Sequence, residues 1–270
     1  NMNKMSARLN LDQQATEKIS FGMQMNVIRT EMERVQNDNA FATPLQLVAQ
    51  SPLTPVYDPE TGELNTETIY YNGLISLRDE TNNQTAFRSL ANIYAAYNIF
   101  RDLTFKSEFG TDIYDLREKN FWGRETITGG PAGEAQNRSV RVINYNWENY
   151  LTYIKSIGVH HLNLVGGMSY QQSNSIGSDI IGKGFPTDDF TNISNAAEVT
   201  TYGGWEEATS YLSYFARASY KINEKYFFTL SGRVDGSSRF GVDNRFGFFP
   251  AGSAGWILSL IHISEPTRPY

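Results

Sequence analysis

The sequence predicts an all-β chain, a partial antiparallel up-and-down transmembrane β-barrel of about nine strands with short periplasmic turns and long extracellular loops. Three observations predict this fold. Apolar and polar residues alternate along many segments, the connections between these segments alternate between short and long, and several segments exceed the usual strand length in soluble sheets. The composition agrees, because aromatic residues make up 13% and charged residues 19% of the 270 residues. This mixture is typical of β-strands joined by many turns.

The composition also excludes several classes of protein. The chain has no cysteine, which excludes a disulfide framework, a thiolate zinc site and a cysteine nucleophile. The formal net charge of −6 argues against a nucleic-acid partner. No stretch reaches the roughly 18 consecutive apolar residues of a transmembrane helix. A transmembrane barrel needs no such stretch, because its strands alternate between apolar and polar residues.

The alternation defines the expected strands. Ile19, Phe21 and Met23, for example, alternate with Ser20, Gly22 and Gln24. Residues of one strand point to opposite faces of a sheet in turn, so each segment has an apolar and a polar face. We expect strands at about 5–13, 17–34, 85–99, 102–116, 138–156, 159–173, 209–222, 225–238 and 245–258.

The connections between these strands favour a barrel over a soluble sandwich. Short connections fall at 14–16, 100–101, 157–158 and 223–224, and long ones at about 35–84, 117–137, 174–208 and 239–244. Short turns at one end and long loops at the other are the layout of outer-membrane barrels. A Greek-key sandwich distributes its long connections over both ends.

Aromatic residues and the first long loop carry further expectations. Seven aromatic residues are expected in interfacial girdles near the strand ends, or alternatively in cross-strand aromatic pairs: Tyr145, Trp147, Tyr153, Tyr170, Tyr220, Tyr226 and Phe228. In the loop, Phe41–Gln50 has the pattern of a short amphipathic helix, and Ser51–Leu64 reads as extended proline segments that end in a glycine turn.

The last third of the chain carries a long and specific motif. Two strands joined by a short turn lead into Arg-Val-Asp-Gly-Ser-Ser-Arg-Phe-Gly at 233–241 and then Asn-Arg-Phe-Gly-Phe-Phe-Pro-Ala-Gly-Ser-Ala-Gly-Trp at 244–256. This stretch resembles the SusC/RagA family of TonB-dependent transporters, as does Ser-Pro-Leu-Thr-Pro-Val-Tyr at 51–57. The resemblance covers residues 5–258, although 120–200 match only by strand rhythm.

The resemblance implies an outer-membrane location and a complete protein with more barrel strands, an N-terminal plug and a TonB-box. It implies uptake of oligosaccharides or peptides, with a SusD-like surface lipoprotein and the TonB complex as partners. The lipid bilayer is the other expected partner. A different class remains open, namely a surface-exposed glycan-binding β-sandwich without transport activity. A third alternative is a secreted polysaccharide-cleaving β-protein, whose activity would be found in soluble extract.

Within the motif, Gly236 and Gly241 are expected to supply positive-φ freedom at a strand tip. Arg233, Asp235 and Arg239 are expected to pair on the lumen side or at the rim and to hold the base of the loop. Among the aromatic residues of the long loops, we single out Tyr202, Trp205 and Trp122. These side chains suit stacking on sugars, and they suit packing against the capping lipoprotein equally well.

Other motifs do not support catalysis or metal binding. His160 and His161 are adjacent on an expected strand, so they point to opposite faces and cannot share a metal. The glycine cluster at 129–133 lacks the phosphate-binding fingerprint, and the group Asp188, Asp189 and Asn192 lacks the ligand spacing of a calcium loop. We therefore expect no enzyme, and no catalytic, cofactor-binding or metal-binding residues.

The two ends of the chain are unusual. Alternation begins almost at Asn1, without a secretory segment. After Leu258 the pattern is lost, and Ser-Leu-Ile-His-Ile-Ser-Glu-Pro-Thr-Arg-Pro-Tyr looks like translated sequencing adapter. We therefore assign residues 1–258 to the barrel domain of a longer protein and residues 259–270 to a non-native tail.

Overall fold

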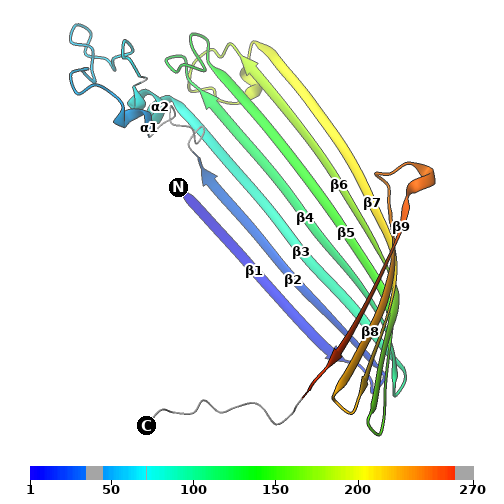
Figure 1. Ribbon diagram of the computed structural model, residues 1–270. Helices are drawn as coiled ribbons and strands as arrows, with labels where there is room; N and C mark the ends of the chain where they lie inside the picture. The colour runs from blue at the N-terminus through cyan, green and yellow to red at the C-terminus, as the bar shows by residue number, and fades with distance from the viewer. Residues whose placement is uncertain (35–44, 71, 259–270) are drawn as a thin grey trace, which may run out of the picture.

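The computed structural model describes residues 1–34, 45–70 and 72–258, which form a single nine-stranded antiparallel sheet (Figure 1). Each strand pairs with the next one in the chain, so the order is β1 to β9 without a crossover. The strands are β1 Met2–Gln14, β2 Ile19–Glu33, β3 Glu80–Phe100, β4 Leu103–Trp122, β5 Glu134–Ile157, β6 His160–Lys183, β7 Glu198–Ile222, β8 Tyr226–Ser237 and β9 Phe246–Trp256.

All nine expected strands are present, and the up-and-down topology is confirmed. Several strands are longer than their alternation indicates, always at the end with the long loops. β6 runs to Lys183 instead of 173, and β7 begins at Glu198 instead of 209. The sheet does not close on itself, because β1 and β9 each pair with one neighbour among the described residues.

The turns at the opposite end are tight. Asn223 and Glu224, between β7 and β8, both have positive φ, at 51° and 54°, the backbone that two-residue hairpin turns require. Gly158, between β5 and β6, has φ 56°, which a glycine adopts without steric cost. These hairpins place all short connections at one end of the sheet.

The first long loop contains two short helices, α1 (Leu45–Val48) and α2 (Gly73–Asp79). Part of the helix expected at 41–50 lies outside the described residues, and the described part is only α1. α2 was not expected; it begins where the Asn72 side chain accepts a hydrogen bond from the Leu74 N–H, a common N-cap arrangement. No helix in the described ranges is long and apolar enough to span a membrane.

The only cluster of buried hydrophobic residues in the described chain lies at the long-loop end, around Phe121, Ala135 and Phe185. No second layer covers the sheet over most of its area, so large apolar side chains stay exposed from β1 to β9. A β-sandwich requires two sheets packed face to face, and the described residues form one sheet. The sandwich alternative is therefore wrong.

Candidate functional site: the polar face of the sheet

The register divides the sheet into two chemically distinct faces. Asn92, Gly110 and Asn146 stand side by side on β3, β4 and β5, and residues two positions away share their face. This face, here called the polar face, carries mostly charged and amide side chains. They include Arg8, Asp12, Gln24, Asn26, Arg88, Asn92, Lys106, Glu108, Asp112, Asn144, Asn146, Glu148, Gln171 and Ser173.

The opposite face, here called the apolar face, has the length of a bilayer. On β4 it presents Leu103, Phe105, Phe109 and Ile113. The next residue on this face is Asp115, which pairs with Arg141 at 2.8 Å. The apolar stretch from 103 to 113 matches the roughly 9–11 residues with which a tilted strand crosses a bilayer. The charged residues beyond Ile113 therefore belong to a part of the sheet that projects into water.

The aromatic residues lie on the apolar face at two levels. Tyr153, Tyr220 and Tyr226 lie near the short-turn end, where Tyr226 stacks with Trp256 at a centroid distance of 6.1 Å. Trp147, like Tyr145 and Tyr170, lies well inside a strand and not near its end. The register places Trp147 opposite Phe109 and Tyr170 opposite Trp147. These residues therefore lie inside the apolar stretch and not at its upper limit. Tyr145 also stacks on Phe109 at 6.3 Å, so girdle and cross-strand pair coexist.

Ion pairs hold the polar face together across neighbouring strands. Arg88 of β3 pairs with Asp112 of β4 at 2.8 Å. Within β4, Lys106 pairs with Glu108 at 2.8 Å. Nearer the loops, Lys183 of β6 pairs with Glu134 of β5 at 2.8 Å. Most of the charge on this face is neutralised within the sheet, which leaves the neutral amides as the main groups for contact with a solute.

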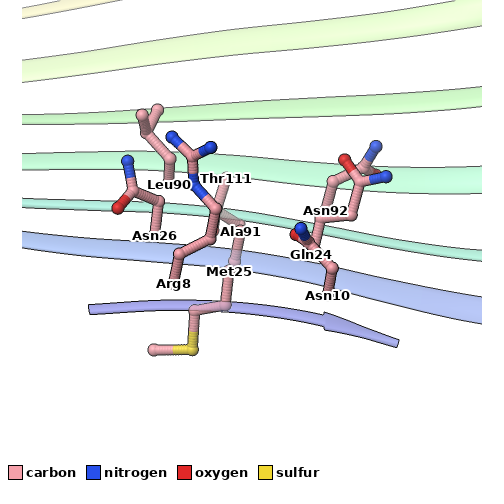
Figure 2. Close-up of a pocket in the computed structure, with 9 residues that line it drawn as sticks. All are labelled: Arg8, Asn10, Gln24, Met25, Asn26, Leu90, Ala91, Asn92 and Thr111. Carbon is pink, nitrogen blue, oxygen red and sulfur yellow. The ribbon is translucent and has the colours of Figure 1, made fainter. Parts of the chain in front are cut away.

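Two shallow depressions lie on the sheet. The first has a volume of about 380 Å³ and is lined from β1 to β4 by residues that include Arg8, Asn10, Asn26 and Asn92. Figure 2 shows Arg8, Asn10 and Asn26 on one side of the sheet, with Met25 pointing to the other. The second, of about 400 Å³, is lined by Gly110, Asp112, Asn144, Asn146, Gln171, Ser173 and Tyr211 together with three neighbours from the other face.

Asn92 and Asn146 flank Gly110 between these depressions. The Asn92 Nδ2 donates to Glu108 Oε1 at 2.5 Å, and the Asn146 Nδ2 donates to Glu148 Oε1 at 3.3 Å. These bonds fix how each amide is turned. Both Oδ1 atoms are buried and lack a hydrogen-bond partner among the described residues, and an unpaired buried acceptor is costly. A hydroxyl or N–H group of a solute reaches these two acceptors only by displacing the side chains that enclose them.

The three singled-out aromatic residues separate into two groups. Tyr202 and Trp205 on β7 are 84% and 47% exposed, and the Trp205 indole lies over Gly177, where a Cβ would approach Nε1 to 2.5 Å. Trp122 is only 8% exposed. Trp122 is therefore not available for stacking on a sugar, and that expectation is wrong.

Of the expectations for the motif residues at the β8–β9 hairpin, one is supported and one is wrong. Arg233 donates to Asp235 at 2.5 Å and to Ser213 at 3.0 Å, and Arg239 donates to Glu207 at 2.5 Å. These bonds support the expected role at the loop base. Gly241 has φ −58° and Gly236 is not in the positive-φ region, so that expectation is wrong. Gly236 instead leaves room for the ring of Phe246, 2.4 Å from where a Cβ would lie.

The histidines and the acidic loop residues have local partners. His160 Nδ1 lies 2.8 Å from the Tyr220 hydroxyl and His161 Nδ1 lies 2.8 Å from Ser156 Oγ. These contacts are on opposite faces of the sheet, as expected. Asp188 accepts the backbone N–H of Arg124 at 3.2 Å, so its carboxylate helps to join two loops.

Local hydrogen bonds lower the pKa of one loop carboxylate, that of Asp58. Asp58 Oδ1 accepts the N–H of Glu60 at 2.7 Å and of Thr61 at 3.0 Å. These backbone hydrogen bonds favour the ionised form and hold the pKa of Asp58 below its ordinary value. The turn continues to Gly62, with φ 76°, and is closed by a bridge between Tyr57 and Leu64.

Comparison with known proteins agrees with this geometry. The family model described as TonB dependent receptor-like, beta-barrel matches residues 26–268. TonB-dependent receptor P3 of Formosa agariphila is 33% identical over 217 residues, which cover 75% of this chain and 22% of that protein. TonB-dependent receptor SusC of Bacteroides thetaiotaomicron is 34% identical over 113 residues, 42% of this chain and 11% of that protein.

Solved structures show the same fold. The RagAB peptide transporter superposes with a TM-score of 0.79 at 21% identity, over 94% of this chain and 30% of that one. The ferripyoverdine receptor of Pseudomonas aeruginosa gives 0.52 at 12% identity, over 94% and 32%. The chain thus spans about a quarter of the length of the curated relatives that it matches over most of its length. The bilayer-length apolar face and these relatives place the protein in the outer membrane. The chain belongs to the family of TonB-dependent receptor β-barrels.

Proposed function

We propose that this chain is part of a transporter that imports oligosaccharides or peptides across the outer membrane. The observation that carries the proposal is the separation of the two faces. An apolar face of bilayer length stands behind a polar face on which ion pairs neutralise most of the charge and neutral amide side chains make up much of the rest. A hydrated, nearly neutral lining of this kind suits a solute rich in hydroxyl or amide groups.

Both cargo classes remain in the proposal, and the relatives are what suggests them. One relative is named SusC, and the RagAB structure carries the description of a peptide transporter. Asn92 and Asn146 suit either class, because an amide oxygen accepts a hydrogen bond from a sugar hydroxyl or from a peptide N–H. We propose a SusD-like surface lipoprotein and the TonB complex as partners, in keeping with the SusC-like sequence motif.

Two parts of this proposal concern the protein as a whole. The first is that the protein acts in uptake and is not an enzyme. We also propose that residues 1–258 are barrel and that residues 259–270, which lie outside the described part, are not native. An independent sequencing read of the gene that reproduces this tail would contradict the second statement.

Uptake by cells tests the function directly. The full-length gene is deleted in the source bacterium, and growth is compared on oligosaccharides and on peptides as sole carbon source. Loss of growth on one class that returns with the restored gene identifies the cargo. Unchanged growth and unchanged uptake of labelled solutes of both classes would contradict the proposal.

A variant pair connects the cargo to the polar face. Replacing Asn92 and Asn146 together by Ala should weaken uptake while the amount of folded protein in the outer membrane stays normal. Ser107→Ala is the matched control, because Ser107 is on the same strand as Gly110 but lies on the apolar face and lines neither depression. Equal uptake by both variants would show that these amides do not contact cargo.

A further inference from the structure

β7 is much longer than the strand beside it. It pairs with β6 from Glu198 to Ile222, but its pairing with β8 begins only at Tyr211. Figure 1 shows β7 continuing well past the loop that joins β8 and β9. The upper half of β7 therefore has a partner on one side and an open edge on the other.

The hydrogen bonds at Ser210 show which backbone groups point to this open edge. The Ser210 N–H donates to Ser238 Oγ at 2.9 Å, and its carbonyl accepts the Ser238 N–H at 2.9 Å. Backbone groups that point to one side recur every second residue in a strand. Tyr202, Gly204, Glu206 and Ala208 thus direct an N–H and a C=O to the same side. No strand in the described ranges pairs with these four residues, here called the β7 edge.

The β7 edge lacks the features that normally prevent strand addition. Exposed edges are usually protected by lysine, proline, a covering loop or a very short strand. Residues 198–210 contain no lysine, arginine or proline. All of Glu198–Ala208 is exposed, with Tyr202 at 84%. Gly203 and Gly204 add no side chain that would keep another backbone away.

The charge of this segment selects its partner. Glu198, Glu206 and Glu207 are its only charged residues. Arg239 pairs with Glu207 and Lys183 lies opposite Glu198, so Glu206 is the charge of the β7 edge itself. The segment is therefore acidic, and it favours a strand with positively charged side chains. A second copy of the chain would bring the same acidic residues to the edge, so like charges would oppose self-pairing.

We propose that the β7 edge binds an extended, basic segment of a protein partner at the cell surface by adding it to the sheet as a further strand. Backbone hydrogen bonds would supply affinity, as in other cases of strand addition. The edge groups lie in the plane of the sheet, so the added strand extends the barrel wall above β8 and leaves the polar face open. This geometry favours a partner protein over cargo that passes through the lumen.

The test uses the full-length receptor in detergent micelles and a fluorescent peptide of alternating lysine and threonine. Saturable binding is expected by fluorescence anisotropy at low salt. Gly204→Pro removes one edge N–H and keeps the N–H groups that pair with β6, because proline is tolerated at such edge positions. A Cβ at this position would lie 3.1 Å from the Gly177 carbonyl oxygen on β6, so Gly204→Ala is measured beside it as the matched control. Gly204→Pro should weaken binding by roughly two- to tenfold, the effect of losing one net hydrogen bond.

Two controls separate backbone pairing from charge and from misfolding. Gly203→Ala should bind as the wild type does, since a Cβ there meets nothing within 4 Å. A peptide N-methylated at alternate amides keeps its charge but cannot pair, and it should lose binding to the unaltered receptor. Glu206→Gln should weaken binding less, with a smaller salt dependence. Absence of binding to the wild type, equal binding to Gly204→Pro, or full binding of the N-methylated peptide would each overturn the proposal.

Discussion

Gly22 allows a hydrogen bond to form across three strands, and this can be tested by adding a single methyl group. Asp12, Gly22 and Tyr94 are aligned on β1, β2 and β3. The Tyr94 ring crosses over Gly22, and its hydroxyl donates to Asp12 Oδ1 at 2.7 Å. A Cβ on Gly22 would lie 2.4 Å from the ring and 2.5 Å from the carboxylate oxygen. Gly22→Ala should therefore displace the ring and break the bond.

The expected size follows from the contacts that are lost. A hydrogen bond to a charged group contributes about 1.5–3 kcal/mol, and the contact of Lys106 with the Tyr94 ring, at 4.5 Å, adds about 0.5–1 kcal/mol. The lower values apply because these groups are exposed. Against this loss of about 2 kcal/mol, alanine is about 0.5–1 kcal/mol better than glycine within a strand. The net prediction is a destabilisation of roughly 1–1.5 kcal/mol.

Denaturant unfolding of the full-length receptor in detergent micelles measures this change. Tyr94→Phe removes the hydroxyl alone. In the double variant Gly22→Ala with Tyr94→Phe, the free energy of unfolding should be close to that of Gly22→Ala alone, because the hydrogen bond is already broken. Gly252→Ala on β9 is the control, since the atoms nearest its Cβ lie at 3.8 Å; this variant should be slightly stabilised. A stabilised Gly22→Ala, or additive effects of the two changes, would refute the reasoning.

Three further predictions address the faces and the loops. Phe109→Lys on the apolar face should cost about 2–4 kcal/mol in lipid vesicles, whereas Asn146→Lys should cost much less; equal losses would contradict the assignment of the faces. Phe185→Ala removes an edge-on contact with Phe121 at 5.2 Å and should loosen the loop at 184–197 by about 3–5 kcal/mol. Limited proteolysis measures this loosening, and an unchanged cleavage rate counts against it. The lowered pKa of Asp58 means that its turn is stable above pH of about 4 and opens as pH falls through that lowered value. Protection of the Thr61 amide from exchange should be lost over this fall in pH, and in the Asp58→Ala variant this amide should be unprotected at every pH.

The alternation of apolar and polar residues predicted the strands well within the bilayer. Between the two interfaces each strand has lipid on one side and a hydrated lumen on the other, so residues such as Phe105 and Lys106 must alternate in polarity. The short turns could be predicted equally well, because a tight turn such as Asn223–Glu224 depends on residues that are adjacent in the sequence. Above the bilayer both faces meet water, and alternation no longer separates strand from loop. For this reason the extensions of β6 and β7 were assigned to loops.

The sequence by itself determined the fold class, the strand order and the identity of the face that meets lipid, because these follow from solvent contact along each strand. Only the tertiary structure decided which residues of different strands meet. Gly22 under Tyr94, Gly177 under Trp205 and the burial of Trp122 all depend on register between strands distant in sequence. The open β7 edge depends on the unequal lengths of two neighbouring strands. Such relations arise between strands, so no pattern within a single strand records them.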